Sequence, residues 1–216
     1  MNDGLHPETL AIRGGKSQTE YGEHNQALFL TSSFMFDSAE TGANLFAGTA
    51  EGYTYSRTAN PTINAFEQRV AHLEQAERGL ATATGMAALQ ATFLTFLQAG
   101  DHLVSSSSLF GTTMGLISNQ LPRCGIEVTL VSQTDLAQWQ AAIKDNTKML
   151  FLETPSNPLN EAGDISALAK MAHEAGALLV VDNSVCSPAL QRPLSLGADL
   201  SVQSATKAID GHGRVM

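Results

Sequence analysis

Asp182 and Lys207 are the residues whose types and positions best suit chemistry. Asp182 follows the apolar run 177–181, and Lys207 ends a Ser-Ala-Thr-Lys sequence that comes directly after a further expected strand, 199–203. Open α/β sheets place ligand-binding groups at the carboxyl ends of their strands, and a carboxylate buried there is costly unless a cation pairs with it. A lysine in an enclosed site can lose its proton at neutral pH and act as a Schiff-base amine. An acid for a protonated ring nitrogen, a lysine for an aldehyde and hydroxyls for a phosphate are the groups that pyridoxal phosphate needs.

Residues 82–88 supply a candidate phosphate site. In this small-residue run the chain turns at Gly85 directly into an expected helix, whose first amides and positive dipole end attract an anion. A plainer interpretation of all these residues is also open: an end-of-strand cap, a common turn and a surface lysine.

Other motifs are weaker. The sequence Gly15-Lys16-Ser17 lacks the first glycine of a P-loop, so it is expected to be a solvated turn. The six histidines form no HExxH motif and no Cys/His cluster, so no metal site is expected.

Short apolar runs that alternate with helical periodicity predict the elements that position these residues. The expected strands span residues 80–84, 102–105, 126–131, 149–153, 177–182 and 199–203. The expected helices span 86–98, 112–121, 135–144 and 165–175, and another begins at Pro61 with Asn60 as its N-cap. This order indicates an α/β fold, a three-layer α/β/α sandwich with a mostly parallel sheet.

Residues 1–59 differ from the rest because they are rich in glycine, serine and threonine and show no long helical period. We expect an extended N-terminal arm that packs against something else, followed by a large domain at 60–216. No closing helix follows the last expected strand, so the large domain is expected to be incomplete at its C-terminal end.

Composition limits the function classes. The formal charge of −9 and the scattered basic residues argue against nucleic-acid binding. No apolar stretch approaches the ~20 residues that cross a membrane, the first residues do not resemble a signal peptide, and the two cysteines form no CxxC pair, so a cytoplasmic protein is expected. Charged residues make up only 15%, which fits either a large core with a Ser/Thr/Gln surface or a surface buried against other subunits.

Several segments together resemble the Cys/Met-metabolism family of fold-type I pyridoxal-phosphate enzymes, which includes cystathionine γ-synthase, methionine γ-lyase and the homoserine sulfhydrylases. The matching segments are Tyr55-Ser56-Arg57 with Asn60-Pro61-Thr62, Thr84-Gly85-Met86-Ala87, Glu153-Thr154-Pro155-Ser156-Asn157-Pro158, Val181-Asp182-Asn183, and Ser204-Ala205-Thr206-Lys207 with Asp210-Gly211. They follow the family's order and spacing over nearly the whole chain.

The resemblance implies a role for each matching residue. Lys207 corresponds to the Schiff-base lysine, Asp182 to the partner of the pyridine nitrogen, and Asn157 to the residue near the phenolic oxygen. The phosphate would be held by Gly85, Met86, Ser204 and Thr206 of the same subunit and by Tyr55 and Arg57 of a neighbouring subunit. Phe110 takes the ring-stacking position that is usually tyrosine, and this feature resembles the O-succinylhomoserine sulfhydrylase branch more than the lyases.

The implied activity is replacement of the γ-substituent of O-succinylhomoserine or O-acetylhomoserine by sulfide to give homocysteine, in methionine biosynthesis. Cystathionine γ-synthase and γ-lyase reactions are alternatives, and a non-catalytic fragment or ligand-binding domain with an idle Lys207 is an alternative of another class. Family members are homo-oligomers, so a tetramer built as a dimer of dimers is expected. They also have a smaller C-terminal domain, which carries the arginine for the substrate carboxylate and which is expected to be absent from this chain.

Overall fold

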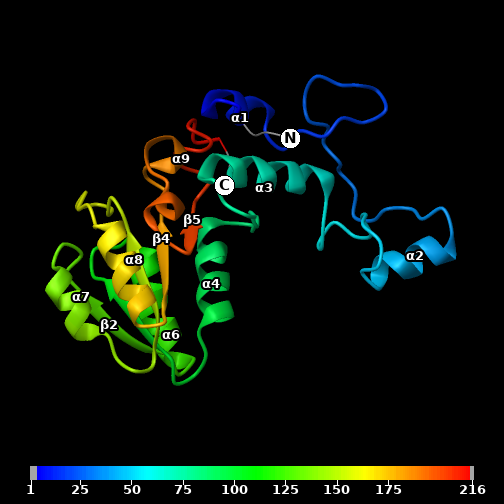
Figure 1. The fold of residues 1–216 in the computed structure, drawn as a ribbon. Helices are drawn as coiled ribbons and strands as arrows, with labels where there is room; N and C mark the ends of the chain where they lie inside the picture. Colours follow the sequence, from blue (N-terminus) through cyan, green and yellow to red (C-terminus); the bar gives the residue numbers. More distant parts are fainter. Residues whose placement is uncertain (1–3, 215–216) are drawn as a thin grey trace. The chain divides into compact units, whose positions relative to one another are not determined.

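The structure is a computed structural model that describes residues 4–214. The chain forms two compact units, Met1–Ala81 and Thr82–Met216, shown in Figure 1. The first unit includes helix α3 (Pro61–Glu74) and so extends beyond residue 60. The expected division at residue 60 into an arm that contacts a neighbouring subunit and a cofactor-binding domain stays a prediction.

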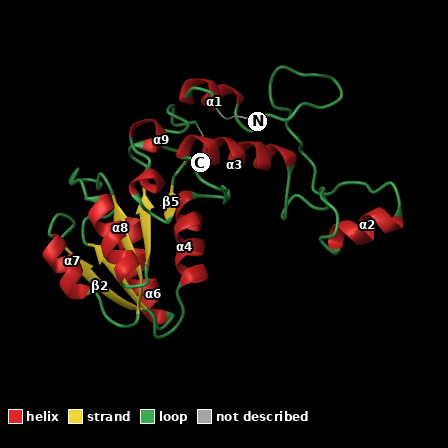
Figure 2. Ribbon diagram, in the orientation of Figure 1, coloured by secondary structure: helices red, strands yellow, loops and turns green. Residues whose placement is uncertain are grey.

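The second unit contains a parallel five-stranded sheet in the order β2-β1-β3-β4-β5. The strands are β1 (His102–Ser106), β2 (Glu127–Val131), β3 (Thr147–Glu153), β4 (Leu178–Asp182) and β5 (Leu200–Val202). The segments between them form helices α4 (Gly85–Phe96), α5 (Gly111–Gly115), the π-helix η1 (Leu116–Gln120), α6 (Leu121–Arg123), α7 (Leu136–Ala142), α8 (Ile165–Glu174), α9 (Ser187–Leu190) and the 3₁₀ helix η2 (Pro193–Leu196). Helices lie on both sides of the strands (Figure 2), so the predicted three-layer α/β architecture is confirmed.

Alternation along the strands explains the two buried layers. Met149 and Phe151 of β3 pack into the cluster that contains Phe93 of α4, whereas Leu150 and Leu152 join the opposite cluster with Trp139 and Leu168 of α7 and α8. Successive strand residues point to opposite faces, so a central strand covered on both sides is apolar throughout. Side-chain caps start the covering helices: Thr84 caps α4, Asp135 caps α7 and Asp164 caps α8.

Two predicted elements differ from the structure. The strand expected at 80–84 is wrong: these residues form a loop before α4, and the Leu80 side chain is 83% exposed. The alanines and threonines of this run have little apolar area to bury, and Thr84 serves as an N-cap instead. The single helix expected at 112–121 is interrupted by the π-helical turn η1.

The first unit contains three helices, α1 (Pro7–Arg13), α2 (Ala39–Phe46) and α3 (Pro61–Glu74). Helix α3 begins as predicted, because the Asn60 side chain accepts a hydrogen bond from the Thr62 amide at 2.8 Å and Pro61 occupies the first helical position. Helix α1 is tied to α3 by the Arg69 guanidinium, which donates to the Gly14 carbonyl at 2.9 Å. The two short helices of the segment expected to be an extended arm were not predicted.

Candidate functional site

Strands β3 and β4 end side by side in two carboxylates, Glu153 and Asp182. They are register partners in the parallel pair, and only 4% and 8% of their surfaces are exposed. This end of the sheet is the carboxyl edge, where open α/β folds bind ligands.

Asp182 is a buried carboxyl group without a cationic partner among residues 4–214. Its Oδ1 accepts a hydrogen bond from the Ser184 amide at 3.0 Å, and no lysine, arginine or histidine among residues 4–214 forms an ion pair with it. Burial raises the pKa of Asp182 above its ordinary value, against the lowering effect of the Ser184 hydrogen bonds. A protonated ring nitrogen would supply the missing charge.

Glu153 binds the backbones of two loops. Its Oε2 accepts from the Phe110 amide at 2.7 Å and its Oε1 accepts from the Asn157 amide at 3.0 Å. Burial is the main cause that raises the pKa of Glu153, and the neighbouring Asp182 charge raises it further. Glu153 lay inside a matching segment of the sequence but was not singled out, although it ends an apolar strand as Asp182 does.

An anion cradle forms where α4 begins. A Cβ on Gly85 would lie 2.9 Å from the Ser204 Cβ, so only glycine lets the helix start approach the segment after β5 this closely. The Thr84 hydroxyl accepts the Ala87 amide at 3.1 Å, while the Gly85 and Met86 amides belong to the first turn, where α-helices offer donors to an anion.

Ser184 connects the cradle to Asp182 and was missed by the sequence analysis. Its amide donates to Asp182 and its Oγ accepts from the Ser204 amide at 2.7 Å. Nothing in the sequence marks this residue, because its partner lies 20 residues away on the segment after the next strand.

The other predicted site residues are less tightly placed. Lys207 is exposed in the turns after β5, where its amide donates to the Ser204 carbonyl at 3.1 Å, and no ion pair joins it to Asp182 in the part of the chain that the structure describes. Thr206 is half-buried in the same turns, and the side chain of Asn157 is exposed. Phe110 is 45% exposed just before α5.

Tyr55 and Arg57 belong to the first unit. The Arg57 guanidinium carbon lies 4.8 Å from the centroid of the Tyr55 ring, so the two predicted phosphate ligands form a cation–π pair.

Two kinds of structure are absent from residues 4–214. No group of three or more His, Cys, Asp or Glu side chains could hold a metal ion. No helix in this range is long and apolar enough to cross a membrane.

Residues 8–216 match the family described as Cys/Met metabolism PLP-dependent enzyme. The chain belongs to this family. The resemblance inferred from the sequence is thereby confirmed, and pyridoxal phosphate is the family's cofactor.

Individual relatives of the Cys/Met-metabolism family agree with this. An O-succinylhomoserine sulfhydrylase of Pseudomonas aeruginosa is 52% identical, over 97% of this chain and 52% of that protein. An L-methionine gamma-lyase of Fusobacterium nucleatum is 44% identical, over 96% of this chain and 53% of that protein. A crystal structure from Campylobacter jejuni that holds N'-pyridoxyl-lysine-5'-monophosphate has a TM-score of 0.93 and 30% identity, over 97% of this chain and 52% of that one. The chain spans about half the length of the curated relatives it matches.

The residues at the carboxyl edge fit the family's cofactor. The buried, cation-free Asp182 suits a ring nitrogen, and the Gly85–Ser204 approach suits a phosphate. Pyridoxal phosphate supplies an electron sink for charge that develops on an attached amino acid.

Proposed function

We propose that the full-length protein replaces the γ-substituent of O-succinylhomoserine with sulfide and so forms homocysteine for methionine biosynthesis; O-acetylhomoserine is the alternative donor. Phe110 is the observation that carries this proposal. Glu153 fixes its backbone beside the site, and a phenylalanine ring can stack but cannot donate or accept a proton. The similarity to an O-succinylhomoserine sulfhydrylase supports the same branch.

The leaving group explains why a phenylalanine suffices. A succinate carboxylate leaves as a stable anion and needs little protonation, whereas a departing thiolate gains from a nearby acid. General acid catalysis contributes ~10²–10⁴-fold where it is well placed. A site without a hydroxyl at this position therefore favours the carboxylate leaving group over methanethiol.

Within this proposal Asp182 would hold the proton of the ring nitrogen, and Asn157 would interact with the phenolic oxygen. Gly85, Met86, Ser204 and Thr206 bind the phosphate. Lys207 would form the covalent link to the cofactor, and its amine would move protons between Cα and Cβ of the substrate. The pyridoxyl-lysine in the Campylobacter jejuni structure supports a lysine in this role.

A second copy of the chain is the proposed partner, with a tetramer as the assembly. The first unit exposes large apolar side chains that a partner would cover, namely Leu28, Leu30, Met35 and Phe46. Tyr55 and Arg57 would then reach the phosphate bound by the neighbouring subunit. In verified hybrids of Arg57→Ala and Lys207→Ala subunits, some sites would be intact, so recovered activity would support this arrangement and its absence would contradict it. The formal charge of −9 argues against nucleic acid as a partner, and a cytoplasmic location is proposed with the biosynthetic role.

The test of the proposed function compares three reactions of the full-length protein. We expect efficient conversion of O-succinylhomoserine with sulfide, slower use of cysteine as acceptor, and slow release of methanethiol from methionine. Phe110→Tyr is the matched variant, because it keeps the stacking area and adds only the hydroxyl. It should cost little in the sulfide reaction.

Each other outcome identifies an alternative. Preference for cysteine over sulfide would indicate a cystathionine γ-synthase, and methionine cleavage at a rate comparable with the sulfide reaction would indicate a γ-lyase. Cofactor binding without turnover of any of these substrates would indicate a ligand-binding protein.

A further inference from the structure

Two loops carry the side chains proposed to contact the cofactor ring, and Glu153 lies between their backbones. Residues 107–110 connect β1 to α5 and end in Phe110, while residues 154–164 connect β3 to α8 and include Asn157. The amides of Phe110 and Asn157 are 47 residues apart in the sequence, yet both donate to one carboxylate, each to a different oxygen.

An ionised carboxylate is the group best suited to this pair of contacts. A carboxylate presents acceptors on both oxygens, whereas an amide of the same size presents one acceptor and one donor group. With 4% of its surface exposed, Glu153 has little water to replace either bond. A buried donor or acceptor left without a partner is costly, so the geometry selects the charged residue.

Stability alone does not explain a second buried carboxylate next to Asp182. Glu153 and Asp182 are strand partners with like charges, and burying charge is more costly than burying an apolar side chain of similar size. The same two loops are also joined elsewhere, by a short hydrogen bond from the Ser108 hydroxyl to the Glu161 carboxylate. Unlike the Ser108–Glu161 hydrogen bond, the Glu153 carboxylate binds the backbone amides of Phe110 and Asn157, the two residues proposed to contact the cofactor ring.

We propose that Glu153 is a positioning residue of the cofactor site, whose carboxylate fixes the spacing between the ring-stacking Phe110 and the phenolic-oxygen partner Asn157. This inference rests on the family's cofactor and on the proposed roles of those two residues, but not on the choice of substrate. Among residues 4–214 the Glu153 carboxylate accepts hydrogen bonds only from these two backbone amides.

The test uses the full-length protein with Glu153→Gln, and Ser108→Ala as the matched control that removes the other tie between the same loops. In the cofactor-free form, amide hydrogen exchange should become faster around residues 110 and 157 in E153Q and remain near wild type there in S108A. Titration with pyridoxal phosphate should show about ten-fold weaker binding for E153Q, which corresponds to ~1.4 kcal/mol, and less than about two-fold for S108A. The visible circular dichroism of the bound cofactor should change in E153Q, because the ring is held at a different angle.

A double-mutant cycle separates positioning from general support of the fold. In a Phe110→Ala/Asn157→Ala background the residues to be positioned are gone, so adding E153Q should weaken cofactor binding by less than about two-fold. If E153Q does not fold, Glu153→Asp replaces it, since the shorter side chain keeps the charge but cannot reach both amides.

Additive losses in the cycle, or unchanged cofactor affinity and circular dichroism in the single variant, would overturn the proposal. An equal loss in S108A would assign the effect to loop docking in general and would also overturn it. These results are distinguishable from failure of the proposed function, because they are read from cofactor binding and amide exchange. The proposed function fails if the wild-type protein binds the cofactor but does not use sulfide, prefers cysteine, or cleaves methionine at a comparable rate.

Discussion

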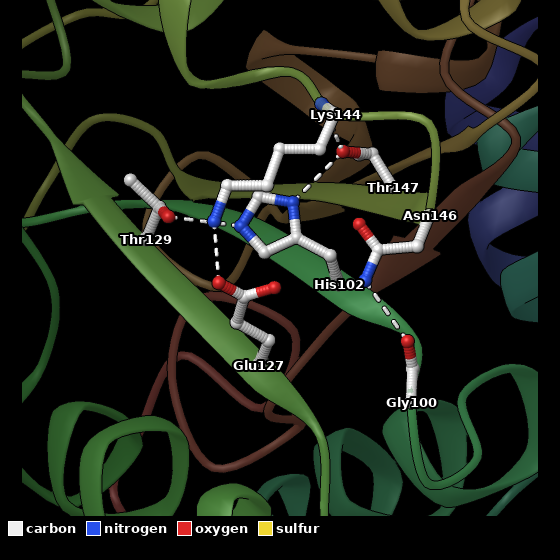
Figure 3. A network of polar contacts seen from close by, with 7 residues as sticks. All are labelled: Gly100, His102, Glu127, Thr129, Lys144, Asn146 and Thr147. Carbon is white, nitrogen blue, oxygen red and sulfur yellow. Dashed lines mark hydrogen bonds and ion pairs between the residues drawn. The ribbon is translucent and has the colours of Figure 1, made fainter.

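Polar groups at the two ends of the parallel strands, the amino edge and the carboxyl edge of the sheet, differ in whether they have charged or hydrogen-bonding partners. At the amino edge, His102, Glu127 and Thr147 are the first residues of β1, β2 and β3, and their side chains are all partnered (Figure 3). The His102 ring contacts the Thr147 hydroxyl at 2.8 Å and the Thr129 hydroxyl at 2.9 Å, and Lys144 forms a short ion pair with Glu127. At the carboxyl edge two buried carboxylates stand together, and neither forms an ion pair within residues 4–214.

This contrast distinguishes residues that stabilise the fold from residues that bind a ligand. A polar group with internal partners stabilises the fold and needs nothing more, whereas a buried charge without a counter-charge implies a ligand that supplies it. Substitutions at the amino edge should therefore change stability, and substitutions at the carboxyl edge should change cofactor chemistry.

Lys207→Ala should have the largest effect on activity and almost none on folding. Lys207 is exposed and contributes little to the core, whereas its loss removes the group that we propose to form the covalent link and to transfer protons. We expect activity below about 10⁻⁴ of wild type and loss of the visible absorbance of lysine-bound cofactor, with an unchanged melting temperature. Retention of both absorbance and turnover would show that another residue forms the link.

Asp182→Asn should uncouple activity from stability. At an effective dielectric of 20, opposite charges 4 Å apart attract by ~4 kcal/mol, so loss of the carboxylate should slow turnover by about three powers of ten. Thermal unfolding of the cofactor-free protein should occur at an equal or higher temperature, because a buried unpaired carboxylate is replaced by a neutral amide that can still accept the Ser184 amide. A clearly less stable cofactor-free variant would mean that Asp182 supports the fold as His102 does.

The carboxyl edge could be predicted from the sequence only in part. Asp182 was recognisable because a charge ends an apolar strand, and Gly85 because a glycine starts a helix. The hydrogen bonds between Phe110 and Glu153 and between Ser204 and Ser184 join segments that meet only in the folded sheet. No local sequence pattern predicts contacts between such distant segments.

The fold was more predictable than these contacts, because apolar runs of β3 and β4 and the period of α8 reflect burial directly. The false strand at 80–84 arose from a short run of small residues that has the pattern of a strand but no partner. His102 was not identified as buried, since a lone histidine before an apolar run is equally consistent with a surface position.

His102→Leu should reduce stability and spare catalysis. The change leaves the Thr129 hydroxyl without its ring partner in a partly buried position, which typically costs about 1–3 kcal/mol. Urea unfolding measures the loss, and turnover of the sulfide reaction should match wild type. Thr129→Val in the His102→Leu background is the control, because removing the stranded hydroxyl should recover part of the loss; a further loss would contradict this account.

The smallest expected effect is a pH dependence of stability at the amino edge. Burial, aided by the Lys144 charge and opposed by that of Glu127, lowers the pKa of His102 from its ordinary 6.5. The unfolded chain therefore binds a proton more readily than the folded one, so the contribution of neutral His102 is complete above pH 6.5 and is lost as the pH falls from there towards the folded pKa. The stability difference between wild type and His102→Leu should accordingly shrink between neutral and mildly acidic pH. A difference that is constant or grows on acidification would mean that the ring is protonated in the folded protein.

The approach of Gly85 to Ser204 also makes the cradle depend on the docking of the edge strand β5. Its two halves lie before the first strand and after the last one, so they meet only when β5 has joined β4. A nascent chain that has emerged as far as β4 has the helix start but not the serine that completes the cradle. Capture of the phosphate during refolding should consequently require docked β5, which makes cofactor uptake a reporter of the docking of this strand.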